Sequence, residues 1–358
     1  MRPPLSTRGL LVILGLSLAS LILVEESLVE ERPRPDAQMM HAASGLTGEW
    51  YHCVRALKEE RGLWRGPVEE AGFPWMLGDH YSPITTTLGS REAKETATNP
   101  AFAALLVRLL HDAGVDSGDV VGITLSGSFP TLGIATLAAL EVMGARAVLV
   151  SSLGSSSYGA NQPEATWIDM EVWLTQVCGM QAASRFVTPG AEGDSGGGLP
   201  EGGLDLLREA ARRTGIAVTT PASLPEGISL RTSLFSDEGI SLLVNIGGGQ
   251  TSLGTCAHAP VLPTGYQESL PICSDPGRGV IERVAERGIP VIHLLNIREL
   301  ALRHGLPVGG KFRSDGQARL FTERSPEKLP IVAVIALLLV VVHMGKLRLL
   351  GSGVTHLC

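Results

Sequence analysis

The amino-acid sequence predicts an α/β protein with a mainly parallel sheet and helices on both faces, a Rossmann-like arrangement. Apolar segments of five to seven residues alternate with helical patterns of about ten residues or more, which is typical of βαβ units. Several of these segments end in loops rich in serine and glycine, as parallel strands do at ligand sites. A chain of 358 residues with 44% hydrophobic residues is also long enough for a sizeable core.

The first two helices of this arrangement have recognisable patterns. Residues 37–63 place apolar side chains at helical spacing, and this helix either lies against the following domain or stands as a stalk. Asn99 as N-cap and Pro100 at the first helical position begin the next helix. Gly114 ends that helix as a left-handed cap.

A strand, a turn and a helix form the centre of the chain. The strand at 119–125 breaks into the turn 126–130, and a helix follows at 131–143. This helix is apolar nearly all round, so we expect neighbours to cover it on several sides. The alternation continues with strands at 146–152, 216–220, 242–246 and 289–295 and with helices at 166–178, 204–213 and 280–287.

Two uncharged apolar runs lie near the ends of the chain. Positive charge flanks them on the terminal side, so the positive-inside rule predicts that both termini face the cytoplasm. The first run also suits a cleaved signal peptide, and the second a buried core segment. The predicted organisation is a cytoplasmic N-terminus (1–8), a transmembrane helix or signal anchor (9–24), a juxtamembrane or stalk region (25–74), an extracytoplasmic α/β domain (75–328), a transmembrane helix (329–345) and a cytoplasmic tail (346–358).

Composition excludes several partners. The net charge of −7, without a basic run, argues against nucleic acid. ATP and NAD are absent outside the cell, so no cofactor is expected, and the lack of Cys-x-x-Cys or His-x-x-x-His argues against a metal site. Cys53, Cys178, Cys256 and Cys273 fall in the displayed region, where they form two disulfides in any of three pairings or remain buried thiols.

Four polar loops suggest a ligand site, at 81–94, 126–128, 151–161 and 245–252. Three of them follow strands of one parallel sheet and must open at the same edge, although turn formation alone explains serine and glycine in any single loop. The candidate ligand-binding residues, which offer hydroxyl, amide, amine or glycine backbone groups, are Tyr81, Ser82, Thr85, Thr86, Lys94, Ser126, Gly127, Ser128, Ser155, Ser156, Asn161, Asn245, Gly247, Gly248, Gly249 and Thr251.

The turn after the central strand also offers candidate nucleophiles. Ser126 or Ser128 lies at a strand-to-helix elbow, with Asp169 as a candidate acid or base. The sequence LSGSFP lacks the G-x-S-x-G spacing of hydrolase elbows, however. His293 lies inside a strand pattern and is expected to be a core or edge histidine. The catalytic residues therefore stay open.

Two glycine-rich segments look like known motifs without their context. NIGGGQT at 245–251 looks like the phosphate loop of actin-like ATPases, but Asn245 replaces the acid that organises the metal. The amides of this loop still suit a carboxylate or another anion. GDSGG at 193–197 matches the nucleophile motif of trypsin-like proteases, whose barrels and upstream histidine are missing, so we expect residues 191–204 to form a flexible glycine loop.

Four longer phrases carry a resemblance that covers most of residues 75–300. YSPITTTLGSREAKETATNP, VVGITLSGSFP, SSLGSSSYGANQPEATWIDME and NIGGGQTSLG together resemble the family called poly-gamma-glutamate system protein. The resemblance implies a membrane-attached accessory protein that acts beside the synthase and export components of poly-γ-glutamate capsule biosynthesis at the bacterial cell surface. It supplies no catalytic residues.

Two functions of different class follow. The first is a non-enzymatic component that binds the emerging polymer, its synthase or its export proteins, although the acidic chain opposes electrostatic capture of a polyanion. The second is an extracytoplasmic hydrolase or transferase that acts on poly-γ-glutamate with a serine nucleophile.

Overall fold

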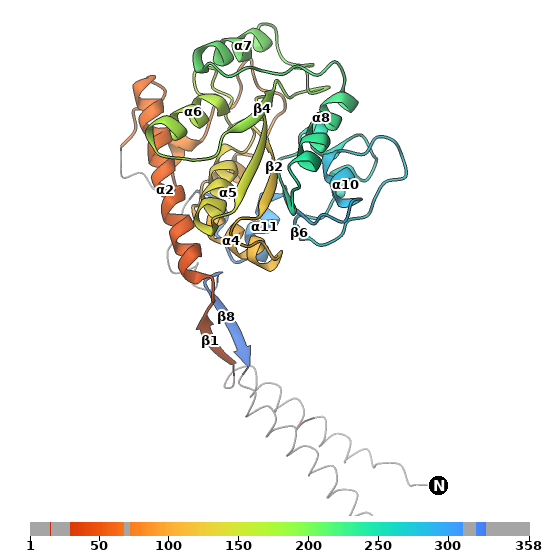
Figure 1. Ribbon diagram of the computed structural model, residues 1–358. Helices are drawn as coiled ribbons and strands as arrows, with labels where there is room; N and C mark the ends of the chain where they lie inside the picture. The colour runs from red at the N-terminus through yellow and green to blue at the C-terminus, as the bar shows by residue number, and fades with distance from the viewer. Residues whose placement is uncertain (1–14, 16–28, 68–71, 311–319, 327–358) are drawn as a thin grey trace, which may run out of the picture. The chain divides into compact units, whose positions relative to one another are not determined.

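The computed structural model describes residues 15, 29–67, 72–310 and 320–326 (Figure 1). The chain divides into two units, Met1–Arg34 with Thr322–Cys358 and Pro35–Phe321. In the first unit, strand β1 (Val29–Pro33) pairs antiparallel with strand β8 (Thr322–Pro326). The apolar runs predicted to span the membrane, 9–24 and 329–345, lie outside the described residues apart from residue 15. Within the described ranges, no helix combines the length and the apolar character needed to cross a membrane.

The second unit is built on a six-stranded sheet, and the predicted α/β class is confirmed. The strands run in the order β4-β3-β2-β5-β7-β6, with only the edge strand β6 antiparallel. In this order, β2 has β3 as its neighbour on one side and β5 on the other, as in doubly wound sheets. The strand bounds are β2 (Val120–Ser126), β3 (Arg146–Ser152), β4 (Ser184–Thr188), β5 (Leu242–Ile246), β6 (Gly265–Gln267) and β7 (Val291–Leu294).

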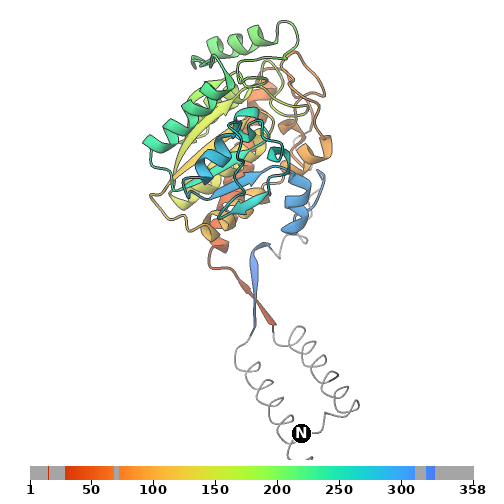
Figure 2. The ribbon, with the colours of Figure 1, turned by 90° about the vertical axis from the view of Figure 1, so that its right-hand side faces the viewer.

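Side chains alternate between the two faces of the sheet, and each face has its own apolar cluster. On β3, Leu149 belongs to one cluster, whereas Val148 and Val150 belong to the other. Helices cover both faces, as Figures 1 and 2 show together. The first cluster includes side chains of α2 (Ala37–Glu60), α4 (Ala101–Asp112), α5 (Pro130–Met143), α6 (Trp167–Val177), α7 (Gly203–Thr214) and α11 (Ile297–Arg303), and the second those of α8 (Leu224–Asp237) and α10 (Val280–Ala285).

Helix α2 is part of this unit rather than a free stalk. Its buried face, with Trp50, Val54 and Leu57, packs into the first apolar cluster. The compact unit starts at Pro35 and includes α2. The remaining short helices are η1 (Pro74–Met76), α3 (Arg91–Ala97), α9 (Gln250–Leu253) and η2 (Ala259–Val261).

Several elements differ from the sequence prediction. The segment 216–220 is no strand but makes a single bridge from Val218 to Val187 in β4. Strand β4 and helix α8 were not predicted. Helix α8 carries Gly227 in its first turns and several serine and threonine residues further on, so its helix propensity is weak. Packing of Ile228 and Phe235 under the sheet outweighs that cost.

A disulfide joins Cys53 of α2 to Cys178 at the end of α6, 125 residues further along the chain. Closing a loop of this length restricts the unfolded chain strongly.

We expect the double substitution Cys53→Ser and Cys178→Ser to lower the free energy of unfolding by about 3–5 kcal/mol, measured by chemical denaturation under oxidising conditions. Under reducing conditions both proteins should have similar stability. Equal stability without reductant would contradict this disulfide.

Candidate functional site

A cleft of about 680 Å³ opens at the carboxyl edge of the sheet. The cleft lies between β2 and β5, which are neighbours in the sheet although β3 follows β2 in the chain. The strand order reverses direction at this point, and open α/β sheets bind their ligands at such a switch point. All four polar loops singled out in the sequence contribute residues to it. The lining residues that carry the argument, called here the serine–glycine cleft, are Thr86, Lys94, Ser126, Ser128, Ser152, Ser156, Asp194, Gly248, Gly249, Gln250 and Thr251.

The turn after β2 forms one wall of the cleft. Its Ser126 Oγ donates a hydrogen bond to Ser128 Oγ at 3.0 Å, and Ser128 N donates back to Ser126 Oγ at 3.3 Å. Gly127 lies between them against the loop that follows β3, where an added Cβ would lie 2.6 Å from Leu153 O. Glycine is therefore required for this close approach. Pro130 then begins α5, and its missing N–H is no loss at this position.

The loop after β3 is hydrogen-bonded to that turn. Ser155 Oγ donates to Gly127 O at 3.0 Å, while Ser156 N donates to Ser128 Oγ at the same distance. Ser155, which is fully buried, therefore holds the two loops together, whereas Ser156, although only 9% exposed, lines the cleft and is placed to contact a ligand there.

Lys94 of α3 reaches across both loops. Its Nζ donates to Ser128 O and to Ser156 Oγ, the latter at 2.9 Å, and lies 3.7 Å from the ring centroid of Phe129. The side chain is only 4% exposed. Burial in this position lowers the pKa of the Lys94 ammonium to about 7, because the charged form loses its hydration. Lys94 therefore changes between its charged and neutral forms near neutral pH, at a position where it contacts Ser128 and Ser156.

The glycine loop after β5 forms the opposite wall. Gly247 has a φ of +92°, which glycine adopts without strain. Gly248 is exposed and Gly249 half-buried, and an added Cβ at either position would meet only ordinary van der Waals contacts. Asn245 does not line the cleft but shapes the loop: its Nδ2 donates to Gly247 O at 2.8 Å, and its Oδ1 accepts from Thr124 Oγ1 at 2.7 Å.

A buried ion pair, which the sequence analysis missed, lies under the cleft. Asp194 Oδ2 and Arg231 Nη1 are 2.6 Å apart, and both side chains are almost fully buried. Ser152 and Thr188, at the ends of β3 and β4, each receive a hydrogen bond from Arg231 Nη2. Residues 191–204 were expected to form a flexible loop, yet the segment 193–197 within them is organised around Asp194. The sequence signal was an aspartate among glycines, a residue that tolerates the observed φ of +63°.

The other predicted ligand residues lie behind or beside the cleft. Asn161 belongs to a network in which its Nδ2 donates to Thr85 Oγ1 and its Oδ1 accepts from Asp79 N, both at 2.9 Å. Ser82 joins the same network, and Tyr81 is 59% exposed. The predicted residues that do not line the cleft are Tyr81, Ser82, Thr85, Gly127, Ser155, Asn161, Asn245 and Gly247.

Asp169, the candidate acid or base, also lies outside the cleft lining. It forms a capping box with Thr166 at the start of α6, and its carboxylate accepts hydrogen bonds from Arg61 and Arg213. A carboxylate that is buried and paired in this way stabilises a helix start. His293 is likewise a core residue, since it is 1% exposed and bonds Asn245 through Nδ1.

Comparison with known protein families, with curated proteins and with solved structures finds no match.

The Asp194–Arg231 pair generates a stability prediction. Arg231→Met leaves the Asp194 carboxylate buried without its cation, so we expect the free energy of unfolding to fall by about 3–5 kcal/mol. Asp194→Asn keeps the shape and tolerates the left-handed backbone. The double variant should therefore lose less than the sum of the two single variants, as measured by chemical denaturation. Additive losses would show that the two side chains are not coupled.

Proposed function

We propose that the chain is a membrane-anchored accessory component of poly-γ-glutamate biosynthesis or export, and that the serine–glycine cleft binds a carboxylate of the polymer. The observation that carries the proposal is the position of Lys94: the cleft holds this cation at the switch point, among hydroxyls and exposed glycine amides. Such a set of donors suits a carboxylate. The sequence resemblance and the two terminal apolar runs support the choice of polymer and of the cell surface.

The binding mode follows from the donors on the two walls. A γ-linked glutamate chain carries one carboxylate on each unit, and a carboxylate accepts hydrogen bonds on both oxygens. Protonated Lys94 supplies a charge-assisted bond, while Ser128, whose Oγ accepts from Ser126 Oγ, offers its own hydroxyl proton. Because one lysine and neutral groups make up these donors, the cleft suits one carboxylate at a time rather than a polyanion held by charge alone.

The pH dependence tests this function. Poly-γ-glutamate stays ionised above about pH 5, whereas Lys94, whose pKa burial lowers to about 7, loses its charge as pH rises through neutrality. We expect binding of a fluorescent poly-γ-glutamate oligomer to the full chain, measured by anisotropy, to weaken by up to about tenfold between about pH 6 and about pH 8, because the charged fraction of a group with this pKa falls by that factor. Lys94→Met should bind weakly at both pH values.

Lys58 provides a matched control. It is also buried, burial lowers its pKa to about 7, and it donates to Leu77 O outside the cleft lining. Lys58→Met should therefore keep the pH dependence of the wild type. If Lys94→Met binds like the wild type at every pH, the cleft does not bind the polymer through this lysine.

A second function, hydrolysis or acyl transfer on the polymer, is favoured by one contact. The amine of Lys94 lies 2.9 Å from Ser156 Oγ, and a lysine with a lowered pKa can serve as the base that activates a serine. In this reaction neutral Lys94 accepts the Ser156 proton, Oγ attacks the amide carbonyl, and the proton passes to the leaving amine. Water then releases the acyl group from Ser156. The geometry moves the candidate nucleophile from Ser126 or Ser128 to Ser156.

The two functions predict opposite pH dependence. Hydrolysis needs neutral Lys94, so the rate at which new amino termini form from poly-γ-glutamate should rise as pH passes about 7. Ser156→Ala should lower this rate by about a hundredfold or more, and Ser126→Ala much less. If the wild-type chain does not shorten the polymer at any pH, the second function is wrong and polymer binding stands alone.

A further inference from the structure

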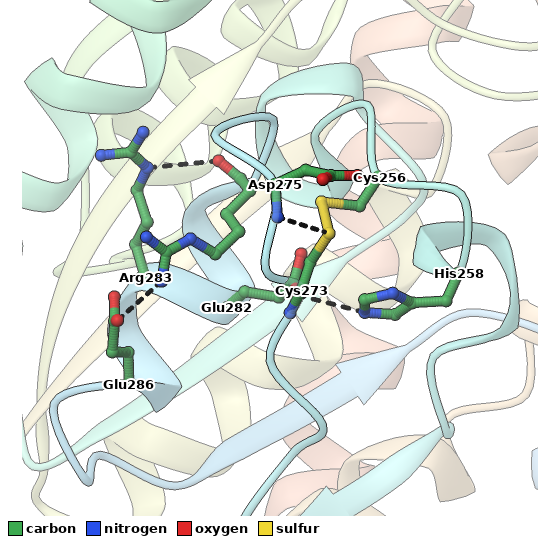
Figure 3. Close-up of a disulfide and its surroundings, with 8 residues drawn as sticks. Cys256, His258, Cys273, Asp275, Glu282, Arg283 and Glu286 are labelled. Atoms are coloured by element: carbon green, nitrogen blue, oxygen red, sulfur yellow. Dashed lines mark hydrogen bonds and ion pairs between the residues drawn. A yellow bond between two sulfur atoms is a disulfide. The ribbon is translucent and has the colours of Figure 1, made fainter.

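A second cluster of reactive side chains lies outside the cleft, between the loop after α9 and helix α10 (Figure 3). Cys256 and Cys273 form a disulfide there, and Glu282 of α10 lies beside it. Both sulfur atoms and a carboxylate oxygen of Glu282 lie within 4.8 Å of one another. The sequence analysis expected no metal site, since the spacing of these residues fits no common motif.

Glu282 is the unusual member of this cluster. Its side chain is fully buried, and Oε1 accepts hydrogen bonds from Cys273 N at 2.7 Å and from His258 Nε2 at 3.1 Å. Oε2 is buried and has no hydrogen-bond partner among the described residues. Burying a carboxylate oxygen without a partner is unfavourable, so Oε2 has an unused lone pair that a metal ion would satisfy.

We propose that the reduced pair Cys256 and Cys273, together with Glu282, binds a zinc ion. Thiolate sulfur and carboxylate oxygen are both zinc ligands, at about 2.3 Å and about 2.0–2.2 Å. Ligand atoms around a tetrahedral ion then lie about 3.5–4 Å apart, within the span of this cluster. The Cα atoms of the two cysteines are 6.5 Å apart, which leaves room for the sulfurs to separate.

Two neighbouring groups fit the thiolate form. Asp275 N donates to Cys273 Sγ at 3.4 Å, and an N–H donor stabilises a negative sulfur more than a neutral one. His258 holds the Glu282 carboxylate from the more exposed side, as histidine and carboxylate pairs do around zinc. The fourth position belongs to water or to His258 after a rotation of its side chain.

The conversion balances with an external thiol as the reductant. Two thiol molecules reduce the Cys256–Cys273 disulfide to two thiols and leave as one disulfide. Zinc then replaces the two cysteine protons, which are released to solvent. The site is therefore a disulfide under oxidising conditions and a metal site under reducing ones.

The site is separate from the proposed polymer function, although it borders the cleft. Gly254 lines the cleft, Cys256 follows two residues later, and Thr255 N bonds Gly277 O at 2.7 Å in the loop that carries Cys273. Zinc would cross-link this wall to α10 without adding a residue to the cleft.

The test uses the full chain, reduced with dithiothreitol and separated from it without oxygen. We expect it to take up about one zinc ion, counted against a chromogenic competitor, and to give a thiolate-to-metal charge-transfer band when cobalt replaces zinc. Glu282→Gln, which keeps the side-chain shape, should bind zinc at least about tenfold more weakly. Cys256→Ser should lose both the zinc and the band.

A control comes from the other cysteine pair. The double variant with Cys53→Ser and Cys178→Ser should still bind zinc after reduction, which shows that the metal is not held there. His258→Ala should weaken binding about 10- to 100-fold. The proposal is overturned if the reduced, folded wild type binds no more zinc than Cys256→Ser, or if the Cys256–Cys273 pair stays oxidised in excess thiol. If the wild type and Glu282→Gln bind zinc with equal affinity, Glu282 is not a zinc ligand.

Discussion

The contact between the turn after β2 and the loop after β3 is the constraint on which the cleft depends. The peptide of Gly127 is hydrogen-bonded on both sides: its N–H donates to Ser152 O, and its C=O accepts from Ser155 Oγ and from Ala160 N. No side chain fits at this position. Because the two loops are fixed to each other, Ser128 and Ser156 face one side chain, Lys94, at defined distances.

Two cations near the cleft show how burial and pairing decide the behaviour of a charge. Arg231 is buried beside Asp194 and donates to five oxygen atoms of four residues, so it remains a fixed part of the floor. Lys94 is buried and has no carboxylate partner among the described residues, so its pKa falls toward neutrality. The lysine is thus the group that responds to pH, while the arginine sets the shape of the site.

The sequence predicted the parts of this site that local patterns encode. Apolar strands ending in serine or glycine located Ser126, Ser128, Ser156 and the loop after β5, because parallel strands end at one edge. It did not predict Asp194 with Arg231, since the two residues are 37 positions apart and neither has a local pattern that indicates a partner. Helix α8, which carries Arg231, was missed for a different reason: its helix propensity is weak, and its packing against the sheet outweighs that weakness. The pairing of the cysteines was undecidable from spacing alone.

The Cys53–Cys178 disulfide closes a covalent ring that contains one wall of the cleft but not the other. Lys94, Ser126, Ser128 and Ser156 all lie within the ring that it closes, whereas the loop after β5 lies outside it. A protease that cuts one exposed loop inside the ring leaves both fragments attached, with the serine wall still held to its lysine. A cut directly after Gly254 lies outside both disulfide rings, so no disulfide bridges the cut. The half of the cleft that holds Lys94 and the three serines is therefore the half that survives a single cleavage.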